Sequence, residues 1–276
     1  RLDFFGKDGQ PVQNSWGSKY YQWQYGKDGS VVEERFSAAG ELMPHRPGFE
    51  FKRIRLFYGP DGHLALMQNI DENGALVASA SGAAQYRYFY DSLGMFDRWE
   101  VYDADGNPAL GPTGTAGEQY TNGVSGFKEI AFFDKEGARS LHASGAAYWR
   151  GKYDPFGNMS ELSFYGVNDE PVIGLRGFHK HHLTWSHDGQ HLMQRDFIGL
   201  NGEPINAADG ISRIAYERDD VGQLTALRFF DANGNPAVSS YERAAAVLYS
   251  YDSGGVRTNT VRLGLDGEPV PDTPAQ

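Results

Sequence analysis

The chain of 276 residues contains no cysteine, and it is poor in positive charge and in long apolar runs. The absence of cysteine excludes disulfide cross-links and thiolate metal sites. A formal net charge of −11 at pH 7 argues against general binding to nucleic acid or to an anionic membrane surface. No apolar run reaches the ~18 residues that a membrane-spanning helix needs.

Glycine, by contrast, occurs at 35 positions, and most of them follow a repeat. A first glycine recurs every 31 to 34 residues, a second follows eight residues later, and a third usually comes 12 residues after the second. The first position is occupied by Gly9, Gly40, Gly74, Gly106, Gly137, Gly202, Gly234 and Gly267, with Asp169 taking its place once. Self-similarity at a fixed period is the signature of a repeat array.

The residues around the first glycine have the composition of a tight turn, as in Asp103-Ala-Asp-Gly-Asn-Pro108. An aspartate can accept hydrogen bonds from its own following backbone, and glycine adopts the left-handed conformation without a Cβ clash. The pattern predicts a type I turn closed by a glycine bulge, with positive φ at the first glycine. Proline just beyond the turn prevents that stretch from serving as a central strand.

The segment before the third glycine alternates between aromatic or aliphatic residues and polar ones, as in Tyr86, Tyr88 and Tyr90. Period-two alternation indicates a strand with one buried face. We therefore expect each unit to contain, in order, a strand, a turn, a short loop, a second strand, a second turn and a third strand. Because one hairpin cannot bury its apolar face alone, we expect neighbouring units to share a core.

The expected fold is all-β: an array of about eight stacked β-hairpin units of 31–34 residues, forming a solenoid or an open coiled sheet. The alternative is a β-propeller, although propeller blades usually have four strands in about 40 residues. We expect residues 1–270 to form a single domain and residues 271–276 to be a Pro-rich disordered tail.

The fourth unit is the irregular one. Glu118, Tyr120 and Asn122 stand where other copies have apolar residues, and a run rich in Gly and Thr, residues 111–117, leads into them. Polar residues at core positions indicate either a functional insertion or a weak point in the array.

Three further phrases carry a family resemblance: Tyr153-Asp-Pro-Phe-Gly-Asn158, Tyr90-Asp-Ser-Leu-Gly94 and Tyr251-Asp-Ser-Gly-Gly255. They resemble the tyrosine–aspartate repeats of bacterial RHS-type proteins, and the resemblance covers essentially the whole chain. It implies β-hairpin sheets that coil into shells or solenoids at bacterial surfaces and in toxins. It therefore implies an extracytoplasmic location (periplasm, cell surface or secreted), with any export signal removed or outside this sequence.

Two motifs suggest metal chemistry. Five of the eight histidines lie within residues 179–191, and imidazole favours Zn, Ni or Cu. The alternative is that histidine fills the repeat pattern as a polar aromatic residue. The Asp-rich turns lack the spacing of a calcium loop. We therefore expect neither a metal site nor a cofactor.

The candidate binding residues are basic and occupy the outward positions of the alternating strands: Arg55, Arg87, Arg150, Lys152 and His182. Aligned along a stacked array, they would form a basic column on an acidic body, able to engage an anionic polysaccharide or an acidic protein segment. The ordinary alternative is solvated surface charge.

We therefore expect a non-catalytic binding or scaffold domain of a bacterial envelope or secreted protein, which engages a protein or polysaccharide partner along its extended surface. The alternative is a polysaccharide-active enzyme with carboxylates on one edge. Exposure of Trp16, Trp99 and Trp149 would favour stacking on a neutral sugar.

Overall fold

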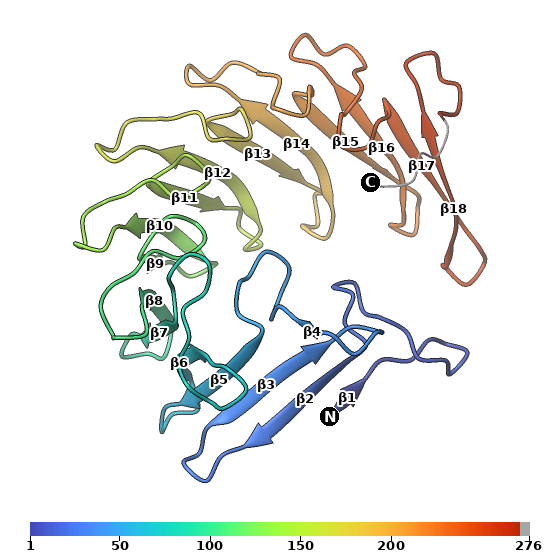
Figure 1. The fold of residues 1–276 in the computed structure, drawn as a ribbon. Coiled ribbons are helices and arrows are strands. Elements are labelled where there is room, and N and C mark those ends of the chain that lie inside the picture. Colours follow the sequence, from blue (N-terminus) through green and yellow to red (C-terminus); the bar gives the residue numbers. More distant parts are fainter. Residues whose placement is uncertain (271–276) are drawn as a thin grey trace. The chain divides into compact units, whose positions relative to one another are not determined.

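The computed structural model describes residues 1–270, so the expected tail at 271–276 lies outside the described residues. Within residues 1–270 all regular structure is β, and Figure 1 shows successive antiparallel hairpins. No helix in this part of the chain could cross a membrane. The strands are β1 Leu2–Asp3, β2 Tyr20–Tyr25, β3 Val31–Phe36, β4 Leu42–Met43, β5 Arg53–Tyr58, β6 Leu64–Asn69, β7 Gln85–Tyr90, β8 Phe96–Tyr102, β9 Gly117–Asn122, β10 Phe127–Phe133, β11 Tyr148–Tyr153, β12 Met159–Tyr165, β13 Lys180–Trp185, β14 Leu192–Ile198, β15 Arg213–Arg218, β16 Leu224–Phe230, β17 Ala246–Tyr251 and β18 Arg257–Leu263.

The chain divides into two compact units. The first unit comprises residues 1–120 and 131–142, and the second comprises residues 121–130 and the chain from 143 onward. Two of the three boundaries fall within the β9–β10 hairpin, in the fourth copy of the repeat, which the sequence marks as irregular, and the third lies between β10 and β11. The expectation of a single domain stays a prediction.

Each repeat contributes one hairpin, closed over the third glycine, and consecutive hairpins pair in sequence order. β7 pairs with β8 over six positions, and β8 then pairs with β9 of the next copy over three. In the second unit the antiparallel pairing runs without interruption from β11 to β18. This confirms the stacked hairpin array, and it differs from the separate four-stranded blades of a propeller.

The strand expected after the first glycine is shorter than the sequence pattern indicates. In most copies it is a single bridge, such as Tyr102 to Pro108 and Phe230 to Pro236. Proline has no N–H to donate, so the ladder continues only through the next residue, where the Ala109 N–H donates to the Val101 carbonyl at 3.0 Å. The copy with Leu42 at this position forms the two-residue strand β4 instead.

The turn prediction is confirmed. The first glycines have φ between 73° and 86°, and Asp169, the one substitute, has φ of 69°. At Asp103 the side chain accepts a hydrogen bond from the Asn107 N–H at 2.8 Å. The Tyr-Asp turns have the same geometry, since Asp154 Oδ1 accepts from the N–H groups of Phe156 and Asn158, both at 2.9 Å.

One glycine assignment is wrong. In the last copy the left-handed residue is Gly255, with φ of 77°, and not Gly254, which the 12-residue spacing indicates. The turn is set by Asp252, whose carbonyl accepts a hydrogen bond from the Gly255 N–H at 3.0 Å. In this copy the aspartate, three residues before the glycine, locates the turn where the repeat period does not.

Each unit has its own core between one face of its strands and the loops around the second glycine. We call this the covered face. In the first unit it carries Ile54, Leu56, Tyr86 and Val101, which pack with loop residues such as Phe51. In the second unit, Phe164, Phe197, Phe229 and Val247 pack with loop residues Phe178, Ile211, Ala146, Ala207 and Ala244. The alternate strand positions form the open face, where side chains such as Gln24, Lys152 and His182 are exposed.

Candidate functional site

All five basic residues expected to bind a partner lie on the open face. Arg55 and Arg87 belong to β5 and β7 of the first unit, and the other three to β11 and β13 of the second. In each strand the neighbouring positions, such as Ile54 and Leu56 around Arg55, face the core. The outward orientation inferred from the alternation therefore holds within each unit.

The two arginines of the first unit are held by neutral groups. Arg55 Nη2 donates a hydrogen bond to the Gly74 carbonyl at 2.8 Å. The Arg87 guanidinium lies 3.8 Å above the Tyr102 ring centroid, a cation–π arrangement. Arg87 also stands directly across from Glu100 in the β7–β8 register. Both guanidinium groups are thus ordered at the surface.

The basic residues of the second unit have acidic neighbours. Arg150 forms ion pairs with Glu129 at 2.8 Å and with Asp169 at 2.5 Å. Lys152 pairs with Glu161 at 3.0 Å, and this contact raises the pKa of Lys152. Arg150 and Lys152 therefore have structural partners, whatever else they bind.

Across these strands the open face forms a row of alternating charge. The register places Lys152, Glu161, His182, Asp196 and Arg213 side by side, and Arg213 pairs with Asp196 at 2.7 Å. Opposite charges directly across antiparallel strands stabilise the pairing. A partner that approaches this row meets both signs of charge rather than a purely basic column.

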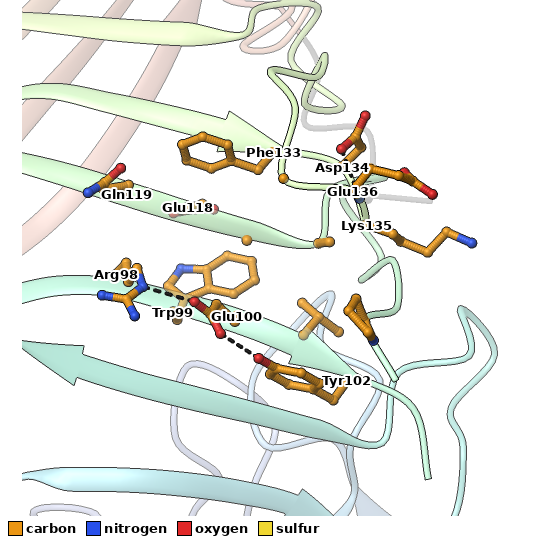
Figure 2. Close-up of a pocket in the computed structure, with 15 residues that line it drawn as sticks. Arg98, Trp99, Glu100, Tyr102, Glu118, Gln119, Phe133, Asp134, Lys135 and Glu136 are labelled. Atoms are coloured by element: carbon orange, nitrogen blue, oxygen red, sulfur yellow. Dashed lines mark hydrogen bonds and ion pairs between the residues drawn. The ribbon is translucent and has the colours of Figure 1, made fainter. Parts of the chain in front are cut away.

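The open face of the first unit contains a pocket of about 480 Å³, shown in Figure 2. It is lined by Arg98, Glu100 and Tyr102 from β8, Gly117 and Gln119 from β9, and Phe133 with the following turn, residues 134–137. Its shape depends on Gly117, which stands across from Glu100 in the register. A Cβ at Gly117 would lie 2.7 Å from the Trp99 carbonyl oxygen, so the two strands approach too closely for any side chain there.

The Glu100 carboxylate is the best-ordered charged group in this pocket. It accepts hydrogen bonds from the Tyr102 hydroxyl at 2.5 Å and from Arg98 Nε at 2.9 Å, both drawn in Figure 2. Burial opposes its ionisation, but these hydrogen bonds outweigh burial and lower the pKa of Glu100. At neutral pH the pocket therefore presents a fixed carboxylate acceptor beside a guanidinium donor, with the Tyr102 and Phe133 rings as apolar walls.

Glu118 and Tyr120, two of the three polar residues of the irregular fourth unit, lie at a second pocket, on the covered face. This pocket, of about 460 Å³, is walled by aromatic side chains, among them Tyr86, Tyr88 and Trp99, and it contains Arg46 and Glu118. Glu118 accepts a hydrogen bond from the Tyr120 hydroxyl at 2.8 Å. Burial nevertheless raises the pKa of Glu118, and burial also raises the pKa of Tyr88 to about 12.

The histidine cluster does not converge on one point. His179 is buried with Nδ1 3.2 Å from the Val172 carbonyl oxygen, His181 is on the covered face, and His182 is on the open face. In residues 1–270 no group of three or more His, Cys, Asp or Glu side chains could hold a metal ion.

The tryptophans differ in exposure. Trp16 is 46% exposed, whereas Trp99 and Trp149 pack against the cores of the first and second units. Of these three side chains Trp16 is the exposed one, while Trp99 lines the pocket on the covered face of the first unit.

Sequence reasoning predicted the outward orientation of the basic residues and missed the pocket of Figure 2. The signal available was Gly117, a glycine at a strand position where other copies have side chains. A glycine inside a strand marks a close backbone approach or an opening for a ligand. The pocket's walls come from two successive hairpins, β7–β8 and β9–β10, and no local pattern identifies them.

No family model matches the chain, and no curated protein matches it. Among solved structures, the chain is similar to one described as "Crystal Structure of TcdB2-TccC3", with 12% identity and a TM-score of 0.34 over 95% of this chain. It is also similar to "Crystal Structure of TcdB2-TccC3-Cdc42", with 13% identity and a TM-score of 0.31 over 89% of this chain. The chain spans 16% and 15% of those chains. Its description as an all-β array of repeated hairpins therefore rests on its own geometry.

Proposed function

We propose that this chain is a non-catalytic binding module of the RHS-type hairpin-repeat class, from a bacterial envelope or secreted protein, and that its open face binds a polysaccharide. The observation that carries the proposal is the pocket of Figure 2, with Glu100 fixed between Arg98 and Tyr102. The Tyr-Asp turns and the turns at the first glycine, which share one geometry, support the class. The absence of cysteine is consistent with an exported protein.

A sugar residue fits the chemistry of this pocket. Its hydroxyl groups can donate to the ionised Glu100 and accept from Arg98 and Gln119, while its C–H face can lie against Tyr102 or Phe133. The pocket volume of about 480 Å³ falls within the range of small-ligand sites. Arg87, on the neighbouring strand β7, lies over the Tyr102 ring. Its positive charge can attract the carboxylate of an acidic sugar.

The alternative is that the open face binds a protein instead of a polysaccharide. The alternating row from Lys152 to Arg213 suits a partner strand or loop that carries both signs of charge. We favour the polysaccharide because the first-unit pocket is concave and lined by convergent polar groups, whereas the row is a surface of paired charges.

The test is binding of immobilised alginate, polygalacturonate and hyaluronan, with neutral dextran for comparison, measured by biolayer interferometry at low and high salt. We expect an acidic polymer to bind, and binding to weaken with salt because exposed charges are screened over ~10 Å at 0.1 M. Glu100→Gln should weaken binding by about tenfold, the equivalent of ~1.4 kcal/mol.

The matched control is Glu217→Gln, which removes one carboxylate of an open-face ion pair, with Arg228 at 2.6 Å, outside the pocket. This variant should bind as the wild type does. Equal weakening by the two substitutions would contradict a site at the pocket, and no binding to any of the polymers would contradict the polysaccharide partner.

Glu118 favours a second candidate, a polysaccharide-active enzyme. A carboxyl group whose pKa is raised by burial in an aromatic pocket has the property of a general acid. If the wild type released reducing ends from one of these polymers and Glu118→Gln did not, the enzyme would replace the binding module as the better account.

A further inference from the structure

The second unit contains a larger cavity on its covered face, of about 580 Å³. Its walls include three phenylalanines, of which Phe178 and Phe197 stack with their centroids 4.7 Å apart. Phe229 from β16 completes the aromatic wall. An apolar cavity of this size with a few polar groups is the usual form of a small-molecule site.

Three polar atoms at this cavity have no hydrogen-bond partner and are shielded from solvent: His181 Nε2, Arg195 Nε and Asp209 Oδ1. A buried polar atom without a partner costs free energy, and the cost is greatest for a charged group. Native structures contain few such atoms, and each calls for an explanation, such as an ion, a water molecule or a ligand. Here three of them line one cavity.

Two arginines on the covered face form ion pairs, whereas Arg195 and Arg176, which both line the cavity, form none among the residues that the structure describes. Arg35 pairs with Glu33 at 2.8 Å, and Arg262 pairs with Glu242 at 3.2 Å. Glu242 also lines the cavity, but its carboxylate already has this partner. Arg195 and Asp209 line the same cavity and form no ion pair with each other or with any other residue that the structure describes.

We propose that this cavity binds a small zwitterion with an apolar body, of which an aromatic α-amino acid is the simplest member. The carboxylate lies against Arg195, the ammonium group donates to Asp209, and the ring packs on Phe178, Phe197 and Phe229. Each charged group of the ligand thus meets a polar atom that has no hydrogen-bond partner in the free chain. The site lies on the covered face of the second unit, so it is independent of the proposed polysaccharide site.

The state of His181 is consistent with this assignment. Burial, together with the positive charges of Arg195 and Arg176, lowers the pKa of His181 to about 4. The imidazole is therefore neutral at pH 7 and leaves the guanidinium groups as the positive charges available to a carboxylate.

The probe is L-phenylalanine, which is titrated into the full chain in an isothermal calorimeter. Thermal unfolding with and without L-phenylalanine gives the change in Tm. Two analogues separate the contacts: phenylacetate lacks the ammonium group, and phenethylamine lacks the carboxylate. We expect saturable binding of L-phenylalanine with a rise in Tm, and binding at least about tenfold weaker for each analogue. No saturable binding of L-phenylalanine, or equal binding of all three compounds, would overturn the proposal.

Arg195→Met keeps the length and apolar stem of the side chain and removes the unpaired charge. It should abolish the difference between L-phenylalanine and phenethylamine, and it should raise the Tm of the free protein because it removes the shielded Nε that has no hydrogen-bond partner. Asp209→Asn, in a loop, gives a second variant if the first does not fold, and it should abolish the difference between L-phenylalanine and phenylacetate.

The control is Arg213→Gln on the open face of the same unit, which should bind L-phenylalanine as the wild type does. Unchanged preferences in Arg195→Met and Asp209→Asn would contradict the site.

Discussion

Replacing Gly106 with valine tests the turn on which the array is built. Gly106 has φ of 86°, and a Cβ added to it would have no heavy atom within 4 Å. The cost of a side chain here is therefore backbone strain alone, without a steric clash. The left-handed conformation costs an L-residue about 1–2 kcal/mol, and β-branched residues tolerate it least. We expect Gly106→Val to lower the free energy of unfolding by about 1–2 kcal/mol.

Two further substitutions separate strain from packing. Gly106→Asn should cost only a few tenths of a kcal/mol, because asparagine tolerates this conformation, as the natural Asp169 does with φ of 69°. Gly177→Ala should cost more than Gly106→Ala, since its Cβ would lie 2.9 Å from the Ala208 backbone nitrogen.

The assay is unfolding in urea, monitored by tryptophan fluorescence. The midpoint urea concentrations are compared among variants that keep the wild-type m value, the slope of unfolding free energy against urea concentration. If Gly106→Val unfolds at the wild-type midpoint, or if Gly106→Asn is as damaging as Gly106→Val, the strain argument is refuted.

Three other predictions concern the irregular unit and two titrating groups. Limited proteolysis should cut first within residues 111–123, next to the boundary between the compact units, and first cuts elsewhere would show that this segment packs like its neighbours. His181, with its pKa lowered to about 4, takes up its proton in the folded chain at lower pH than in the unfolded chain, so it should make unfolding easier as pH falls from about 6.5 to 4. That slope should be absent from His181→Leu in urea titrations across this range. Burial opposes the ionisation of Glu33, but hydrogen bonds from His45, Trp23 and Arg35 lower its pKa to about 2, so its stabilisation is present above about pH 4.5 and lost towards pH 2. The stability gap between the wild type and Glu33→Gln should close over that interval, and a gap that persists at pH 2 would contradict the hydrogen-bonded carboxylate.

The sequence predicted the local geometry well, because each turn is determined within about five residues. In the turn at Asp103, the N–H groups of Gly106 and Asn107 donate to the carbonyl and the carboxylate of Asp103, so the contacts that close the turn are all local. The alternation of Tyr86, Arg87 and Tyr88 likewise predicts which side chain faces the core. In the last copy the repeat period predicts the left-handed glycine at Gly254, whereas the structure has it one residue later, at Gly255.

The sites were less predictable, since they combine residues from different copies of the repeat. The pocket of Figure 2 needs Glu100 from one hairpin and Phe133 from the next, and it depends on the missing side chain of Gly117. The acidic partners of Arg150, Glu129 and Asp169, are 21 and 19 residues away along the chain. Only the register between strands, which sequence alone does not give, brings these groups together.

Hydrogen–deuterium exchange with and without the bound acidic polysaccharide tests the central claim, that the open face is the binding surface. The account predicts slower exchange in β8, Phe96–Tyr102, and in residues 133–137, which line the pocket, and no change in residues 207–211, a loop over the covered face of the second unit. Protection confined to the covered-face loops, with β8 unchanged, would contradict it.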